Sequence, residues 1–252
     1  MLRIAAALCF FSSAYQYQRY SNTVFSYLFN DIGLSETICE AIVLSMVVGL
    51  MLSSLAVLIP NKVSTQFSLV GAVILCLEAT ALTIYPPEWI TVFNLPCHAL
   101  RILTPLALVL FQVGKPAWAI RVLCIASSLT FMGHGANALN EKALFLDYLL
   151  AFFHDLGSPI SLKMGILLLH IVGTIDIALA QHAAFFHQRR IIWVFRYMAT
   201  WGLITACARI TFMGWGSWHE VLVRAPHFLG PLCLCFILGR KNYSTILCRP
   251  LE

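Results

Sequence analysis

The stretch TFMGHGANAL, residues Thr130–Leu139, closes an apolar run that begins at Ala117. It sets a histidine between two glycines and follows them with an asparagine, although most of the run before it is apolar. Small residues on a membrane helix let another helix, or a ligand, approach the backbone closely. We therefore expect this helix to make a close contact here, either with a neighbouring helix or with a bound molecule.

Long apolar runs make up most of the remaining chain. Of its 252 residues, 60% are hydrophobic and 11% are charged, whereas soluble domains carry about 25% charged residues. So few charges cannot cover a surface that faces water, and the runs approach the roughly 20 residues of a membrane-spanning helix. The sequence predicts an all-α membrane protein with spans, or most of spans, at Thr37–Ile59, Phe67–Ile84, Ala99–Val113, Ala117–Phe131, Met164–Phe186, Ile191–Ile210 and Phe228–Leu238.

Charge and cysteine content exclude some other functions. The formal net charge is +5, but the basic residues are spread through loops, so we predict the lipid bilayer as partner and no nucleic acid. The nine cysteines lie mostly inside apolar runs and form no CxxC pair. This placement favours packing roles for the cysteines over redox or metal-binding roles.

An internal match indicates a duplication. Sequence similarity at a fixed spacing is the usual sign of a repeated structural unit. The matched stretches are Val48–Ala56 with Val172–Ala180, Pro105–Leu108 with Pro231–Leu234, and Leu2–Ile4 with Ile120–Val122.

The duplication predicts eight membrane helices in two parallel four-helix units. The first unit is residues 1–114, the second is residues 117–243, and residues 244–252 form a cytoplasmic tail. An even number of helices in each unit makes the two units parallel. The first residues also resemble a short signal peptide, but the match of Arg3 to Arg121 favours a retained first helix.

The distribution of charges predicts the orientation. With eight crossings, one side collects Arg3, Lys62, Lys115, Arg121, Arg189, Arg190, Arg196, Arg240, Lys241 and Arg249. The opposite side carries Arg19, Lys142, Lys163 and Arg224 together with Asp31, Glu36, Glu40, Glu88, Glu141, Asp147, Asp155 and Glu220. Because basic residues accumulate on the cytoplasmic side, we expect both termini in the cytoplasm, in a bacterial-type inner (cell) membrane.

Ionisable residues inside the predicted spans indicate buried pairs or a ligand site. Such residues are unfavourable in lipid and usually face the bundle interior in pairs. We predict one pair between Glu78 and Arg101 and a second between Asp176 and Arg209. These pairs either fix the helix register or line a polar cavity.

Further polar residues fall toward the predicted outer face. The candidate ligand or proton site comprises His134, Asn137, His170, Asp176, Arg209, Trp218 and His227. Because His134 and His170 lie at comparable depth on consecutive helices, a bis-histidine haem b is one alternative to helix packing. We predict no metal site, since the histidines lack the spacing of a metal motif.

Two short motifs carry a family resemblance. Phe131–Leu139 is similar to the pattern F-x-x-x-G-x-x-K-L, but has GHG and no lysine before the leucine. Trp218-His-Glu220, Arg224-Ala225 and Pro231-Leu232 are similar to a W-E-x-x-x-R-A-x-x-x-x-x-P-L stretch in bacterial relatives. In these motifs the second half resembles the DoxX-like membrane family. The resemblance implies a four-helix unit and a link to quinone-coupled sulfur oxidation.

Three functions are consistent with these observations. The first is a redox-associated protein that binds a quinone near the outer face: His134 and Asp176 would handle protons, Arg209 would hold a carbonyl or anion, and Trp218 would stack on the ring. The second is a non-catalytic accessory or assembly subunit of a larger membrane complex. The third is a small-solute transporter, which the parallel arrangement of the units disfavours.

Overall fold

The computed structural model describes residues 1–20, 22–84, 92–185 and 191–239. All regular elements in these ranges are helices. The predicted tail at 244–252, and charged residues such as Glu88, Arg189 and Arg190, lie outside them. The helices of the first half are α1 (Leu2–Arg19), α2 (Thr23–Asn30), α3 (Glu36–Ala56), α4 (Lys62–Ile84), α5 (Asn94–Cys97) and α6 (Ala99–Gln112).

The second half contains a similar succession of long and short helices. They are α7 (Pro116–Leu139), α8 (Ala143–Asp155), α9 (Leu162–Phe185), α10 (Ile192–Met213), η2 (Trp215–Ser217), α11 (Trp218–Leu222) and α12 (Ala225–Gly239). In each half the first long helix packs on the second, as α1 on α3 and α7 on α9, and the third packs on the last, as α4 on α6 and α10 on α12.

The chain is a helical membrane protein. Among the described residues, the 4 helices α3, α4, α7 and α9 are long and apolar enough to cross a membrane, and the bent pair α11–α12 is a further candidate. The other predicted spans fall on helices that are shorter or more polar. Helix α6 has 14 residues, α1 carries Ser12 and Ser13, and α10 carries Arg196 and Arg209.

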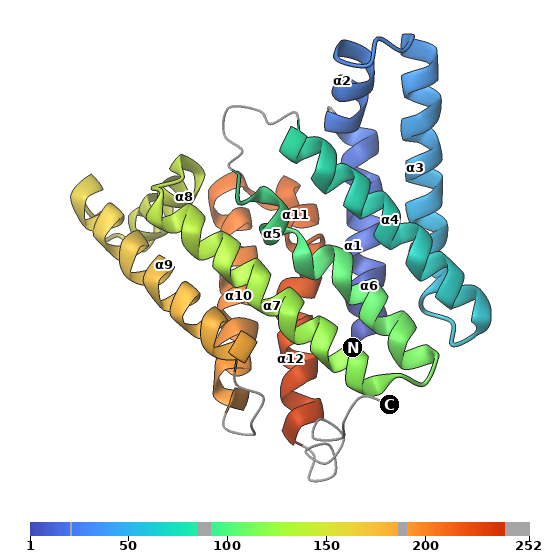
Figure 1. The fold of residues 1–252 in the computed structure, drawn as a ribbon. Helices are drawn as coiled ribbons and strands as arrows, with labels where there is room; N and C mark the ends of the chain where they lie inside the picture. Colours follow the sequence, from blue (N-terminus) through green and yellow to red (C-terminus); the bar gives the residue numbers. More distant parts are fainter. Residues whose placement is uncertain (21, 85–91, 186–190, 240–252) are drawn as a thin grey trace.

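Four helices lie in the middle of the bundle: α6 and α12 contact each other, and each of them also contacts α1 and α7. Helices α3 and α9 lie at opposite edges (Figure 1). In the apolar 18-residue stretch of each helix, 56% of the residues are buried inside the protein in α7 and 22% in α9. A helix surrounded by protein needs fewer apolar residues than one surrounded by lipid, which explains the polar residues of α1. Helix α6 is apolar but, with 14 residues, is shorter than a full span.

The start of α1 and the end of α12 lie at the same end of the bundle, and α2 and α8 lie at the other (Figure 1). At the first end, Arg3 donates from NH1 to the carbonyl oxygens of Val57 at 2.7 Å and Ile59 at 3.1 Å. Carbonyls in the last turn of a helix lack intrahelical partners. Arg3 thus closes the end of α3 and ties it to α1.

Glycines in the stretch Thr130–Leu139 bring α7 close to two neighbours. A Cβ atom on Gly133 would lie 2.9 Å from the backbone nitrogen of Cys97 in α5, and one on Gly135 would lie 2.8 Å from the carbonyl oxygen of Gly173 in α9. The backbones therefore touch at both positions, with no room for a side chain. The expected close contact is one between helices.

Replacing Gly173 with alanine tests this contact. The new Cβ would lie 2.8 Å from the Gly135 carbonyl oxygen, so the helices would have to separate. We expect a loss of about 1–3 kcal/mol in stability, although alanine favours helix more than glycine does. Thermal unfolding in detergent measures the change. Gly216→Ala is the control, because no atom lies within 4 Å of its added Cβ; equal melting temperatures for the two variants would contradict the contact.

Candidate functional site

The predicted pair between Glu78 and Arg101 is present. Arg101 NH2 of α6 lies 3.1 Å from Glu78 Oε2 of α4, and the two side chains are 8% and 13% exposed. The same NH2 group donates to Ser13 Oγ at 3.1 Å, and NH1 lies 2.8 Å from His98 Nδ1. Because arginine only donates, His98 Nδ1 accepts this bond. The guanidinium therefore joins α1, α4 and α6.

The predicted pair between Asp176 and Arg209 is wrong. Arg209 Nε of α10 lies 3.6 Å from Glu220 Oε2 of α11 instead. Asp176, which is 3% exposed, accepts a hydrogen bond of 2.8 Å from the Tyr197 hydroxyl. A short helix in the connection before α12 thus supplies the counter-charge that we expected from the middle of α9.

Glu220 collects several partners on one carboxylate. Its Oε2 is bonded by Arg224 NH1 and lies near Arg209, while its Oε1 accepts from Gln16 Nε2 of α1 at 2.8 Å. His219 Nε2 lies 3.8 Å from Oε1. The sequence analysis did not predict a pair between Glu220 and Arg224, although a spacing of four residues is a known signal for an ion pair where the chain is helical; here Arg224 lies in the turn that follows α11.

Arg209 is the most buried arginine or lysine in the second half of the described chain. It is 5% exposed, its NH1 donates to the Thr205 carbonyl oxygen at 2.7 Å, and its guanidinium lies 5.1 Å from the Tyr148 ring centroid. Its Nε has no hydrogen-bond partner within normal distance. The contact with an aromatic face stabilises the cation without neutralising its charge.

His134 and His227 face each other across α7 and α12. Their ring centroids are 5.5 Å apart, and the His134 ring also lies 5.9 Å from that of Phe145. His227 is 6% exposed, and its Nε2 has no hydrogen-bond partner. Asn137, one turn further along α7, donates from Nδ2 to Cys97 Sγ at 3.2 Å.

These groups form one polar cluster toward the α8 end of the bundle. His134 lies within electrostatic range of Lys142, Arg209 and Arg224, and His227 lies within range of His98, Arg101 and Arg224. We define the polar cluster as Glu78, His98, Arg101, His134, Lys142, Arg209, Glu220, Arg224 and His227.

Other predicted site residues make separate contacts. His170 Nε2 lies 3.3 Å from Glu141 Oε1, and both side chains are partly exposed. Trp218 packs against Tyr15 and Phe11 of α1, with ring centroids 5.0 and 6.3 Å away. His134 and His170 therefore contact different partners, which does not support a haem held between them. In the described ranges, no group of three or more His, Cys, Asp or Glu side chains is arranged to hold a metal ion.

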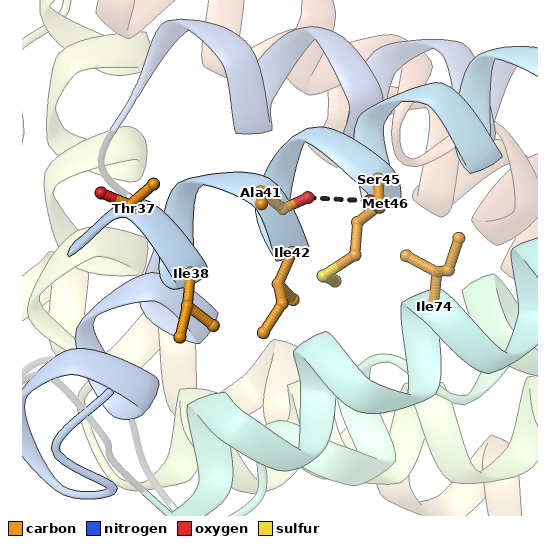
Figure 2. A pocket seen from close by; sticks show the side chains of 7 residues that line it. All are labelled: Thr37, Ile38, Ala41, Ile42, Ser45, Met46 and Ile74. Atoms are coloured by element: carbon orange, nitrogen blue, oxygen red, sulfur yellow. Dashed lines mark hydrogen bonds between the residues drawn. The ribbon is translucent and has the colours of Figure 1, made fainter. Parts of the chain in front are cut away.

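An apolar groove lies elsewhere, between α3 and α4. Its lining residues are Thr37, Ile38, Ala41, Ile42, Ser45, Met46 and Ile74 (Figure 2). The Ser45 hydroxyl donates to the Ala41 carbonyl oxygen at 2.7 Å and so offers no free donor to a ligand. None of the predicted site residues lines this groove.

Comparison with known proteins gives no family: no protein-family model, curated protein or solved structure matches the chain. The DoxX-like resemblance therefore rests on the two short motifs alone.

Replacing Glu220 with glutamine tests the central role of this carboxylate. Arg209 and Arg224 would then face a neutral amide, and leaving buried cations without their counter-charge costs about 3 kcal/mol. We expect a corresponding fall in thermal stability in detergent. Glu141→Gln is the matched control, because its pair with His170 is half exposed and should contribute less than about 1 kcal/mol. If both variants unfold at the same temperature, Glu220 does not organise the cluster.

Proposed function

We propose that the protein binds a quinone, or a similar ring molecule with acceptor oxygens, in the polar cluster, as a redox-associated component of its membrane. The observation that carries this proposal is His227 Nε2, a buried polar atom without a partner. Buried polar groups are nearly always hydrogen-bonded, so a buried polar atom without a partner in the protein indicates a partner from another molecule. A ligand is one such partner.

The chemistry of the cluster favours a ligand that accepts hydrogen bonds. Arginine and lysine only donate, and the cluster contains Arg101, Lys142, Arg209 and Arg224. A quinone presents carbonyl oxygens that only accept, together with an apolar ring. Phe145, beside His134, offers an aromatic surface to such a ring.

His134 and His227 are the groups that would exchange protons with this ligand. Imidazole is the side chain whose ordinary pKa lies nearest neutral pH, and quinone reduction consumes protons. The sequence also suggested Asp176 and Trp218 as site residues. Asp176 is hydrogen-bonded by Tyr197, and Trp218 packs against Phe11 and Tyr15. The proposal does not depend on them.

A second candidate is an accessory subunit of a membrane complex, for which helix α9 offers an exposed apolar face. Only 22% of the residues in its apolar 18-residue stretch are buried inside the protein. Met164, Leu167, Ile171 and Ile175 are exposed along the helix at spacings of three or four residues, which places them on one face. Lipid or another membrane helix would cover this face equally well.

We further infer that the two halves are duplicated units that together cross the membrane eight times. An ungapped alignment of α4 with α10 places Gly71 on Gly202, Cys76 on Cys207 and Glu78 on Arg209. The same order of long and short helices in both halves supports this inference. Both halves then start and end on the same side of the membrane.

We infer that this side is the cytoplasm of a bacterial-type cell, because Arg3, Lys62, Lys115, Arg121 and Arg196 lie near helix ends on it. A fluorescent protein fused to the C-terminus should then fluoresce, since it folds only in the cytoplasm. Alkaline phosphatase inserted at Gly157, in the exposed connection from α8 to α9, should be active outside. The reverse pattern would contradict the orientation.

The functional proposal is tested with the full chain in mild detergent and a short-chain ubiquinone as probe. Quenching of tryptophan fluorescence measures binding. We expect His134→Phe and His227→Phe to weaken binding about tenfold, the usual effect of losing a hydrogen bond to a buried polar ligand group. His154→Phe is the matched control, because the His154 side chain is 79% exposed.

Two results would decide against quinone binding. One is equal affinity in the His134, His227 and His154 variants. The other is a wild-type protein that binds no quinone but purifies with one fixed protein partner in constant ratio, a result that favours the accessory subunit.

A further inference from the structure

Positive charge exceeds negative charge in the part of the polar cluster that the second half contributes. Lys142, Arg209 and Arg224 lie within electrostatic range of one another. Glu220 is the carboxylate that the described residues place against Arg209 and Arg224. A buried cation without a counter-charge is strongly unfavourable in a medium of low dielectric constant. This half of the cluster therefore lacks negative charge.

The first half shows that the excess is not a general property of the fold. There, Arg101 and Glu78 neutralise each other in a direct pair. In the alignment of α4 with α10, Arg209 occupies the position of Glu78. An acid at this position gives a balanced pair, and a base gives an excess of positive charge.

We infer that Lys142, Arg209 and Arg224 bind an oxyanion, a phosphate or carboxylate group that arrives from the α8 end of the bundle. The inference rests on the proposed function in one respect, namely that the polar cluster is a ligand site. It adds the chemical class of the group bound beside His134 and His227.

The three cations are graded in exposure from the surface inward. Lys142 lies in the connection between α7 and α8 and is half-buried, the Arg224 side chain is 22% exposed, and the Arg209 side chain is 6% exposed. Arg209 Nε has no hydrogen-bond partner. Guanidinium groups match the geometry of phosphate and carboxylate oxygens, and an ammonium group attracts the same anion as a point charge.

Lys142 also gives the site a pH dependence. Burial lowers the pKa of its ammonium group; Cys97 opposes this shift, and Arg209 and Arg224 add to it. The Phe145 ring, 5.6 Å from Nζ, is uncharged. The charge that attracts an oxyanion is therefore present below this lowered pKa and disappears as the pH rises through it. Oxyanion affinity should fall over the same pH range.

The test uses the full chain in detergent and inorganic phosphate as probe, with calorimetric titration and thermal unfolding as readouts. At a phosphate concentration about 100 times Kd, we expect the melting temperature to rise by roughly 5 °C. A second arm places the protein in nanodiscs of phosphatidylcholine with or without phosphatidylglycerol, and identifies retained lipid by native mass spectrometry. Retention of phosphatidylglycerol without phosphate binding identifies a lipid headgroup as the source of the oxyanion, and the opposite result identifies a free anion.

Variants separate a binding role from a structural one. Arg209→Gln and Lys142→Gln should each weaken binding at least about tenfold. Lys142→Gln keeps the test valid if the Arg209 variant fails to fold. Lys163→Gln is the matched control, because Lys163 is exposed at the start of α9. With inorganic sulfate, whose charge is constant from neutral to alkaline pH, the affinity of the wild type should fall as pH rises, and that of Lys142→Gln should not.

Two results would overturn the inference. The first is that neither phosphate nor phosphatidylglycerol binds. The second is that the Arg209 and Lys142 variants bind as tightly as Lys163→Gln. Because the ubiquinone assay is separate, oxyanion binding without quinone binding would contradict only the quinone proposal.

Discussion

A guanidinium group inside a membrane bundle is stable only beside a counter-charge, and much of the helix arrangement follows from this requirement. Arg101 of α6 pairs with Glu78 of α4 and donates a hydrogen bond to Ser13 of α1, so it connects the three helices. Arg209 and Arg224 meet at Glu220, whose carboxylate also binds Gln16 of α1. Both buried networks therefore include α1, which explains why this helix lies among its neighbours in the middle of the bundle rather than in lipid.

Close backbone contacts complete the arrangement. Gly133 and Gly135 are two residues apart on α7 and contact different helices, α5 and α9. Membrane helices gain little free energy by moving apolar surface from lipid into protein, so their association depends on close van der Waals packing. Glycines allow this packing, and larger side chains would prevent it. The polar side chains between and after these glycines, His134 and Asn137, are thereby fixed against α12 and α5.

The sequence was sufficient to predict helical class, the membrane as solvent and the Glu78–Arg101 pair, because each depends on composition or on depth along a helix. The partner of Arg209 was not predictable in this way. Asp176 lies at a depth in the membrane that would allow it to pair with Arg209. The pairing also depends on how each helix is rotated about its axis, and Asp176 faces Tyr197 instead. Glu220 belongs to a helix of 5 residues outside the apolar runs, so hydropathy treats it as part of a loop.

Several hydrogen bonds join the two halves, and two of them would oppose a movement of one half against the other. Ser12 of α1 donates to the His219 carbonyl oxygen at the start of α11, and Thr130 of α7 accepts from the Leu100 backbone nitrogen at the start of α6. Each half thus inserts its first helix against the last segment of the other. A rocking motion of one half against the other, as in alternating access, would break both bonds at once. Slow opening motions should be confined to the edges of the bundle, where α9 is held mainly by α7.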